Sequence, residues 1–544
     1  MDNDNTKRTL LAVVLSTLVI VAWGYLFPPQ PAPQAPAPAA TAQPDAAAQV
    51  DAAIPGDPAQ AAQAAPAQAP AFAPSAGRDV VVDTPLYRAV FNSAGGILTS
   101  FELKKHLDSI DAGASPVNLI APRAVGVGPL GLLWQDQGTW RPESSQWAAP
   151  ATEALTVGEA GAELTFQGSF GGLAITRTMR FAPDTYLIEE TVTLANATGA
   201  PVTGRLGFNI GVAPLTAKDD TYNPTRVSFL DAKGVDDESD REDLAAGLRR
   251  AEGVKWGAIQ SNYFTVALAP EDGDLTLKSK FTDELFRMVV DKDGLSVAPG
   301  TSREVKASYY LGPVMSKYLS LAPHGLDSLV TYGFFDVISV PLMKGLLYIH
   351  SVVGNWGVAI IILTIIIKLA FWPLSQKSYQ SMNKMKKIQP LMAKVREQYK
   401  DDRQKMNEEM MRLYKTYKVN PAGGCLPMLL QIPVFLALYQ ALIGAVELRH
   451  AAFIAHLPFT DIVWLADLSA KDPFYITPLV MGATMFLQQK MTPAPGDPTQ
   501  AKIMLFMPVI FTFMFLNFPS GLVVYWLVNN VLSIAQQWWL LRKA

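Results

Sequence analysis

The amino-acid sequence predicts a polytopic α-helical membrane protein with six transmembrane helices and an external antiparallel β-sandwich domain. Charged residues make up only 17% of the 544 residues, well below the roughly 25% of a soluble domain. Apolar runs long enough to span a bilayer occur near the N-terminus and again after residue 354. Between them, short segments alternate apolar and polar residues, which is the period of half-buried strands.

The first transmembrane helix is predicted at residues 9–27, directly after Lys7 and Arg8. A helix of this length rises about 28 Å, close to the ~30 Å hydrocarbon core of a bilayer. The alternative is a cleaved signal peptide, because small-residue motifs follow at residues 32–37, but a signal core usually spans about 7–15 residues. We therefore expect an uncleaved anchor with a cytoplasmic tail at residues 1–8.

A linker and the sheet domain come next. Residues 28–77 are mostly Pro, Ala and Gln and cannot bury an apolar core, which predicts a disordered linker. Residues 78–318 contain short alternating runs, such as 164–170, 173–181 and the longer 254–268, separated by Gly, Pro, Asn and Asp. This pattern is typical of an antiparallel β-sandwich around one core.

The segment at residues 319–354 is apolar but interrupted by Pro341, Lys344 and His350. Apolar residues early in this segment have helical spacing, which predicts an interfacial helix. These residues are Leu326, Leu329, Val330, Phe334 and Val337.

Five further apolar segments are each long enough to span a membrane. They are predicted at residues 355–373, 425–446, 474–490, 503–518 and 521–541. The connecting segments are a basic helical hairpin at 374–424, a loop at 447–473, a loop at 491–502 and a C-terminal tail at 542–544. No internal repeat is visible, so an inverted-repeat transporter is not indicated.

Lysine and arginine orient these helices. Residues 374–424 contain twelve Lys and Arg against five acidic residues, whereas residues 447–473 contain two against four. Because basic loops remain in the cytoplasm, we expect the hairpin, the 491–502 loop and both termini to be cytoplasmic. The 447–473 loop and the sandwich are then outside.

The sequence gives no sign of an enzyme, a cofactor or a metal site. The motifs GxxxxGK[ST], HExxH and GxSxG are absent. One cysteine excludes a thiolate-rich metal site, and of five scattered histidines only His106 lies in the predicted sandwich.

One formal charge, Lys368, lies well inside the C-terminal spans. A lysine at the bilayer centre costs about 2.5–3.5 kcal/mol. It could instead extend toward the cytoplasmic end at Trp372, about 6 Å away. Other polar residues at helical spacing favour a hydrated cavity, although amides also serve as interhelical contacts. These polar and aromatic positions are Thr364; Gln431, Phe435 and Tyr439; and Tyr525, Asn529, Ser533 and Gln537.

The basic hairpin is a second candidate site. Methionines at helical spacing are more often packing residues, yet methionine surfaces also adapt to varied apolar partners. Its basic residues could bind anionic lipid or ribosomal RNA. The candidate residues are Met385, Lys386, Lys387, Met406 and Met410.

Several ordered motifs resemble the YidC/Oxa/Alb family of membrane protein insertases. In the C-terminal half they are residues 409–415, 419–425, 431–435, 506–511 and 518–522. In the predicted sandwich, Leu86-Tyr87, Phe91, Gly95-Gly96, Trp256 and Tyr263-Phe264 resemble the periplasmic domain of Gram-negative members.

The resemblance implies a five-helix insertase core with an amphiphilic groove open to the cytoplasm and the inner leaflet. The family places an arginine in this groove, and Lys368 stands at that position, keeping the charge but losing the fork of donors. Tyr525 and Trp526 match a Tyr-Tyr pair. The external domain would resemble a sugar mutarotase, but it lacks the histidine pair that this reaction needs. The implied groove residues are Lys368, Thr364, Gln431, Tyr525, Trp526, Asn529 and Ser533.

The function implied is insertion and chaperoned folding of nascent inner-membrane proteins, alone or with the Sec translocon. The expected partners are nascent membrane proteins, the Sec translocon, the ribosome and anionic phospholipids, with no nucleotide. The expected location is the inner membrane, with both termini cytoplasmic and the large domain in the periplasm. A membrane channel or transporter is the alternative.

Overall fold

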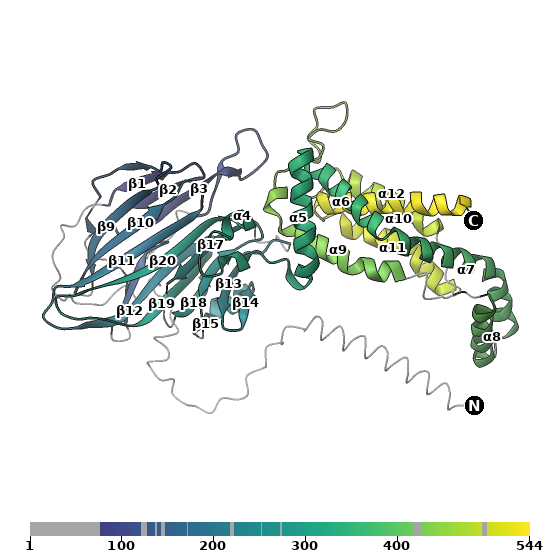
Figure 1. Ribbon diagram of the computed structural model, residues 1–544, viewed down its shortest axis with the longest axis horizontal. Helices are drawn as coiled ribbons and strands as arrows, with labels where there is room; N and C mark the ends of the chain where they lie inside the picture. Colours follow the sequence, from purple (N-terminus) through teal and green to yellow (C-terminus); the bar gives the residue numbers. More distant parts are fainter. Residues whose placement is uncertain are drawn as a thin grey trace. The chain divides into compact units, whose positions relative to one another are not determined.

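The computed structural model describes residues 77–543 except for 121–127, 137–138, 143–146, 149, 171, 218–221, 252, 272–274, 418, 420–425 and 492–497 (Figure 1). The predicted N-terminal tail and first transmembrane helix lie outside the described residues. So do all but the last residue of the predicted linker, and half of the predicted loop at 491–502.

The N-terminal part of the described chain is built from three β-sheets. Neighbouring strands are antiparallel, except that β1 and β8 pair in parallel. The five-stranded sheet consists, in spatial order, of β4 (Pro116–Asn118), β3 (Ile97–Leu107), β2 (Tyr87–Asn92), β1 (Asp79–Asp83) and β8 (Ala154–Thr156).

The two larger sheets contain the remaining strands. In spatial order, the nine-stranded sheet consists of β14 (Gly234–Glu238), β13 (Arg226–Asp231), β16 (Trp256–Gln260), β17 (Phe264–Pro270), β20 (Ser302–Pro313), β11 (Leu187–Asn196), β10 (Leu173–Phe181), β9 (Ala162–Phe170) and β7 (Trp147–Ala148). The six-stranded sheet consists of β15 (Leu248–Arg250), β18 (Leu275–Thr282), β19 (Leu285–Val297), β12 (Val202–Val212), β5 (Leu132–Asp136) and β6 (Thr139–Pro142). The prediction of a domain rich in antiparallel sheets is confirmed.

The run at residues 254–268 forms two strands rather than one. A turn separates β16 from β17, where the Ser261 hydroxyl accepts the backbone N–H groups of Tyr263 and Phe264 at 3.3 and 3.1 Å. Short polar side chains bond local backbone in this way and compete with a continuous strand.

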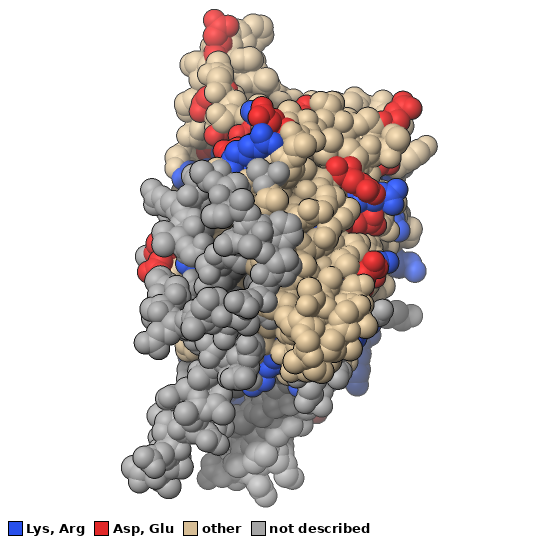
Figure 2. All heavy atoms as spheres, turned by 90° about the vertical axis from the view of Figure 1, so that its left-hand side faces the viewer, with Lys and Arg blue, Asp and Glu red and all other residues tan. Residues whose placement is uncertain are grey.

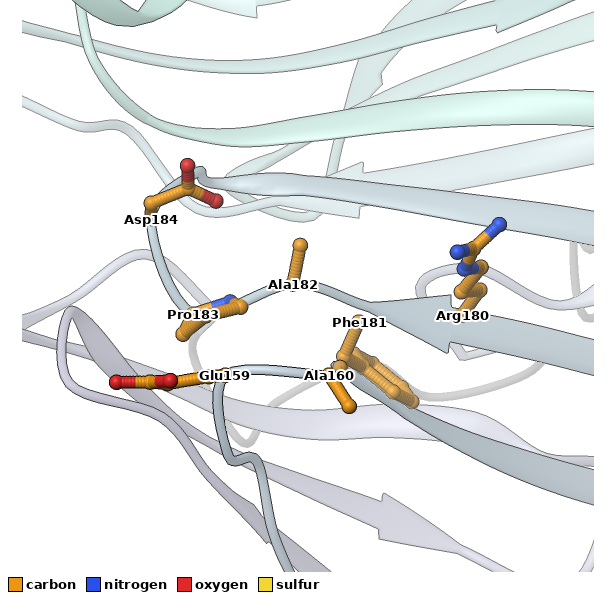
Figure 3. A pocket seen from close by; sticks show the side chains of 8 residues that line it. Glu159, Ala160, Arg180, Phe181, Ala182, Pro183 and Asp184 are labelled. Atoms are coloured by element: carbon orange, nitrogen blue, oxygen red, sulfur yellow. The ribbon is translucent and has the colours of Figure 1, made fainter.

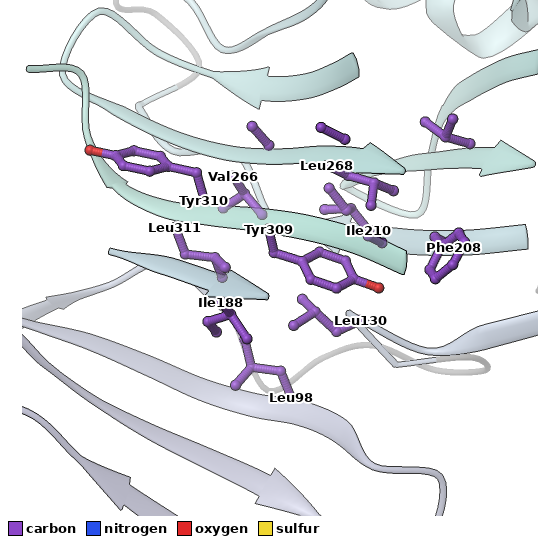
Figure 4. Packing of buried hydrophobic residues seen from close by; sticks show 14 of the residues in the cluster. Leu98, Leu130, Ile188, Phe208, Ile210, Val266, Leu268, Tyr309, Tyr310 and Leu311 are labelled. Carbon is purple, nitrogen blue, oxygen red and sulfur yellow. The ribbon is translucent and has the colours of Figure 1, made fainter. Parts of the chain in front are cut away.

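One apolar core joins the three sheets, with side chains from each of them packed together. Figure 4 shows this packing around Ile188, Phe208 and Tyr309, with Leu98 contributed by the five-stranded sheet. Alternating residues of β10 point into it, as the period-2 pattern requires.

A charged pair lies inside this core. The Arg177 Nε atom donates to a Glu190 carboxylate oxygen at 2.5 Å, and both side chains are fully buried. Arg177 also donates to the carbonyl oxygens of Gly95 and Leu130, and the Tyr309 hydroxyl donates to Glu190 at 2.9 Å. Burial and the Glu190 charge hold the pKa of Tyr309 well above its usual value. Every charge here has a partner, as burial demands.

The C-terminal part of the chain is helical. Its longer helices are α5 (Asp336–Val353), α6 (Trp356–Ala370), α7 (Trp372–Gln398), α8 (Arg403–Thr416), α9 (Leu426–Gly444), α10 (Ile476–Met491), α11 (Pro498–Phe515) and α12 (Ser520–Lys543). The shorter elements are α3 (Arg241–Ala246), α4 (Ser316–Leu319), η2 (Leu326–Leu329), η3 (Gly333–Phe335) and η5 (Val446–Leu448).

Local sequence explains several of these boundaries. The Asn355 side chain accepts the Val358 N–H and begins α6, and Asp402 accepts the Lys405 N–H and begins α8. The segment at 319–354, expected to form an interfacial helix, contains α5 from Asp336 onward, whereas its earlier part contains only the last residue of α4 and the short elements η2 and η3. Gly333 adopts a φ angle of 72° and interrupts the helical spacing that the sequence displays, and Gly325, with a φ angle of 77°, precedes it.

Among the described residues, α5 alone is long and apolar enough to cross a membrane by itself. Helices α6 and α7 pass the same test together, although they are bent by 64° at their junction. Membrane helices are therefore present, but length and composition do not establish the number six.

The helices pack around a second apolar core. Helix α5 lies against α6 and α9, α12 lies against α6 and α10, and α10 lies against α11. The three segments that supply the predicted polar residues, α6, α9 and α12, thus belong to one bundle (Figure 1).

Candidate functional site

The centre of the candidate site is Lys368, whose side chain points between helices. It lies in the last turn of α6, where only 9% of its surface is exposed. Its Nζ atom donates to Asn529 Oδ1 at 3.1 Å and to Ser533 Oγ at 2.6 Å. The four-residue spacing on α12 brings both acceptors to the same helix face.

A third helix joins this cluster through an amide. Gln431 of α9 donates from Nε2 to Asn529 Oδ1 at 2.9 Å, and its side chain is also hydrogen-bonded to the Tyr525 hydroxyl. One oxygen of Asn529 therefore accepts from both Lys368 and Gln431. The structure brings together five of the sequence-predicted residues, from three helices, in one network.

Thr364 lies beside this network but is satisfied locally. It is 2% exposed, and its hydroxyl donates to the Ile360 carbonyl oxygen of the same helix at 2.6 Å. Such back-bonding is a common arrangement for a threonine within a helix. Among the described contacts, its hydroxyl makes no hydrogen bond to Lys368.

An aromatic cluster flanks the polar one. The Trp526 ring lies 4.4 Å from Phe435 on α9, 5.1 Å from Phe515 and 6.3 Å from Phe511 on α11, measured between ring centroids. Trp526 thus lies between α9 and α11. The sequence identified Trp526 and Phe435, but the spacing of α11 gave no reason to single out Phe511 and Phe515.

The electrostatics of the site are unusual because no acid balances the cation. Within the described residues, Lys368 makes no ion pair and is bonded only to neutral side chains. Hydrogen bonds to a charged group stabilise by about 1.5–3 kcal/mol, which is comparable to the cost of placing a lysine within a bilayer. An anionic group that reaches Lys368 gains a further attraction in a medium of low dielectric constant.

The hairpin formed by α7 and α8 has a small core of its own. Met410 is buried, and Met385 and Met406 pack against the cluster around Ile388 and Met392. This placement favours the packing interpretation of the methionines. Lys386 and Lys387 are exposed on α7.

The sheet domain contains a surface hollow of about 330 Å³ at the turns flanking β9 and β10. Its charged side chains, Glu159, Arg180 and Asp184, are spread apart and do not converge on one point (Figure 3). On the domain face in Figure 2, acidic and basic side chains lie next to one another where residues are described. This hollow has neither the convergent groups of a catalytic site nor a continuous basic surface for nucleic acid.

No group of three or more metal-ligating side chains occurs in the described part of the chain. None of the described residues that line the hollow is a histidine.

Two family models together match most of the chain and define its class. Residues 79–344 match the model described as YidC periplasmic domain, and residues 348–544 match the model described as 60Kd inner membrane protein. The protein is therefore an inner-membrane protein with a periplasmic domain.

Full-length relatives identify the family. The chain is 54% identical over 540 residues to the membrane protein insertase YidC of Oleidesulfovibrio alaskensis, with 99% of each chain covered. It is 53% identical over 544 residues to that of Nitratidesulfovibrio vulgaris, again with 99% of each covered. A crystal structure of an active YidC insertase covers 86% of this chain and 94% of its own, at 19% identity and a TM-score of 0.35. The chain belongs to the YidC family of membrane protein insertases.

This result confirms the resemblance and the prediction that the chain is not an enzyme, because the family is one of insertases. A galactose mutarotase related enzyme of Lactobacillus acidophilus is also similar, over 43% of this chain and 97% of its own, with 11% identity and a TM-score of 0.30. That similarity is confined to part of the chain.

Proposed function

We propose that this protein inserts nascent membrane proteins through the polar cluster around Lys368, which receives the hydrophilic flank of the client. The observation that carries the proposal is a buried cation that, among the described residues, is held only by neutral side chains from α12. An acidic or polar client flank can replace these contacts without breaking an ion pair.

Polar side chains of α9 and α12 form the proposed path for that flank. Gln431, Asn529 and Ser533 offer donors and acceptors where lipid would offer none. Each unsatisfied polar group in hydrocarbon costs several kcal/mol. A polar surface partway into the membrane therefore shortens the apolar distance that the flank has to cross.

The aromatic cluster gives the apolar part of the client a surface to follow. Trp526 lies between α9 and α11, and these helices are not a closely packed pair among the described residues. We place the exit to lipid there. About twenty apolar client residues then partition at about −0.3 to −0.6 kcal/mol for each strongly apolar one. The total free energy of this partitioning supports transfer of a short polar tail without nucleotide hydrolysis.

The hairpin is proposed as the cytoplasmic receiving surface. The methionines of the hairpin pack in its own core, whereas Lys386 and Lys387 are exposed. We therefore propose that these two lysines contact the partners. We assign them to anionic phospholipid headgroups, worth about 1 kcal/mol for each lysine near the surface, and to the ribosome. The Sec translocon is the proposed partner for larger clients. We propose that both termini lie in the cytoplasm, because the loops with an excess of Lys and Arg remain there.

Site-directed crosslinking tests the groove. A photoreactive residue at Thr364 or Tyr525, both buried beside Lys368, should crosslink to stalled nascent chains, whereas one at Val531, exposed on the outside of α12, should not. Equal yields at all three positions would contradict a groove at the polar cluster.

A further inference from the structure

A second compartment adjoins Lys368. A cavity of about 170 Å³ lies between α6 and α12. Its lining residues are Ile365, Lys368, Leu369 and Trp372 from α6, and Leu532, Ala535 and Gln536 from α12.

This cavity lies on a different side of Lys368 from Thr364 and Trp526, neither of which lines it. Successive helical residues are rotated by about 100°, so Ile365 and Leu369 are turned to one side of Lys368 and Thr364 to the other. On α12, the same rotation turns Leu532 away from Trp526. Lys368 therefore lines the cavity and also contacts the polar cluster, whereas Thr364 and Trp526 are turned away from the cavity.

Gln536 is the unexplained group in the cavity. Its side chain is 1% exposed, and neither Nε2 nor Oε1 has a hydrogen-bond partner among the described residues. Leaving a buried amide unpaired costs about 1–3 kcal/mol. Lys368 uses its Nζ atom for two hydrogen bonds and retains one N–H. Donors from two helices thus line one small cavity.

The residues around the cavity indicate which kind of ligand supplies hydrogen-bond acceptors for Lys368 and Gln536. Ile365 and Leu369 are 37% and 60% exposed on the outer face of α6, where acyl chains contact a membrane helix. Trp372 lies where α6 bends into α7, and tryptophan favours the level of lipid headgroups. The site therefore combines a cation, an amide and an apolar wall at the membrane boundary.

We propose that this cavity binds the phosphate of a membrane phospholipid. Phosphate oxygens accept from Lys368 Nζ and Gln536 Nε2, and an acyl chain lies along Ile365 and Leu369. Anionic phosphatidylglycerol is favoured over zwitterionic lipid, because none of the described residues that line the cavity is acidic. The site shares Lys368 with the proposed groove but does not depend on client insertion.

The test is retention of phosphatidylglycerol by the purified full-length protein, measured by native mass spectrometry. Gln536→Glu places a carboxylate of the same shape beside Lys368 and repels phosphate, while Ala535→Leu fills the cavity without touching a polar group. Val531→Leu is the matched control, because Val531 lies one turn away on α12, is 48% exposed and does not line the cavity. Thermal unfolding checks that each variant is folded.

We expect both cavity variants to retain at least tenfold less phosphatidylglycerol than the control, with no competition from inorganic phosphate. Unchanged retention would overturn the proposal and leave the cavity to water. Displacement by inorganic phosphate would overturn it in favour of a free-anion site. Client insertion, measured separately, tests the groove, because Ala535→Leu leaves the amide network intact.

Discussion

The protein buries a cation in each of its two kinds of structure and treats the two differently. In the sheet domain, Arg177 is paired with Glu190, and each of its three side-chain nitrogen atoms donates a hydrogen bond. In the helical bundle, Lys368 is held by Asn529 and Ser533 and makes no ion pair with any residue that the structure describes. The first arrangement is closed and stabilises a fold. The second leaves a net positive charge, which is what a site for an anionic partner requires.

The largest effect on stability is expected from removing Arg177, the partner of the buried Glu190. Arg177→Met leaves Glu190 buried without its partner and should destabilise the sheet domain by about 3–5 kcal/mol. Urea unfolding of the full-length protein measures this. Arg180→Met on the same strand, where Arg180 is exposed, should change stability by less than about 0.5 kcal/mol. Similar losses of stability in both variants would contradict a stabilising role for the buried Arg177–Glu190 pair.

Removing the charge of Lys368 should reduce client insertion more than it reduces the stability of the protein. Lys368→Met removes the attraction for an acidic client flank, worth about 1.5–3 kcal/mol, so insertion should fall by about ten- to hundredfold. Lys368→Arg should restore most of it. Insertion is measured with a short-tailed client in proteoliposomes. A loss that occurs only together with unfolding would show that Lys368 is structural.

A third prediction concerns a variant in which Lys368 acquires an acidic partner. Asn529→Asp places a carboxylate 3.1 Å from Lys368 Nζ in the observed geometry and makes the site resemble the Arg177 pair. We expect insertion of clients with acidic flanks to fall by about tenfold or less while the protein remains folded. Asn529→Gln is the neutral control. Faster insertion by the Asp variant would contradict the role given to the free charge.

The smallest effect concerns pH and the protonation of His106 on β3, whose pKa is lowered by burial and also by the nearby charges of Arg449 and His450. Burial lowers the pKa of His106 to about 4, below its usual 6.5. The unfolded chain therefore binds more protons between these values, and stability should fall as the pH drops from about 6.5 to 4. His106→Gln should flatten that slope in unfolding curves. An unchanged slope would assign the acid sensitivity to other groups.

Sequence patterns predicted the parts of the molecule that follow simple periods. Alternation located the strands of the sheet domain, and four-residue spacing on one helix located Asn529 and Ser533. A lone lysine in an apolar run was conspicuous because lipid penalises charge. The same reasoning missed Phe511 and Phe515, because α11 is apolar on all sides and only its packing against Trp526 distinguishes one face.

Other features depend on contacts between distant segments. Arg177 occupies an inward position of β10, where alternation predicts an apolar residue, and its partner lies on β11. The apolar spacing at residues 326–337 suggested one helix, but Gly333 takes a positive φ angle within it and divides it. Gln536 escaped notice because its lack of a partner becomes visible only in the packed structure.

Charge reversal at position 368 is the most direct test of the central claim. One short-tailed client is prepared with an acidic or a basic flank, and the insertion of both is measured with the original protein and with Lys368→Glu. We predict that the original protein prefers the acidic flank and that the variant prefers the basic one. Equal insertion of both flanks by both proteins would contradict a free buried charge as the origin of client recognition.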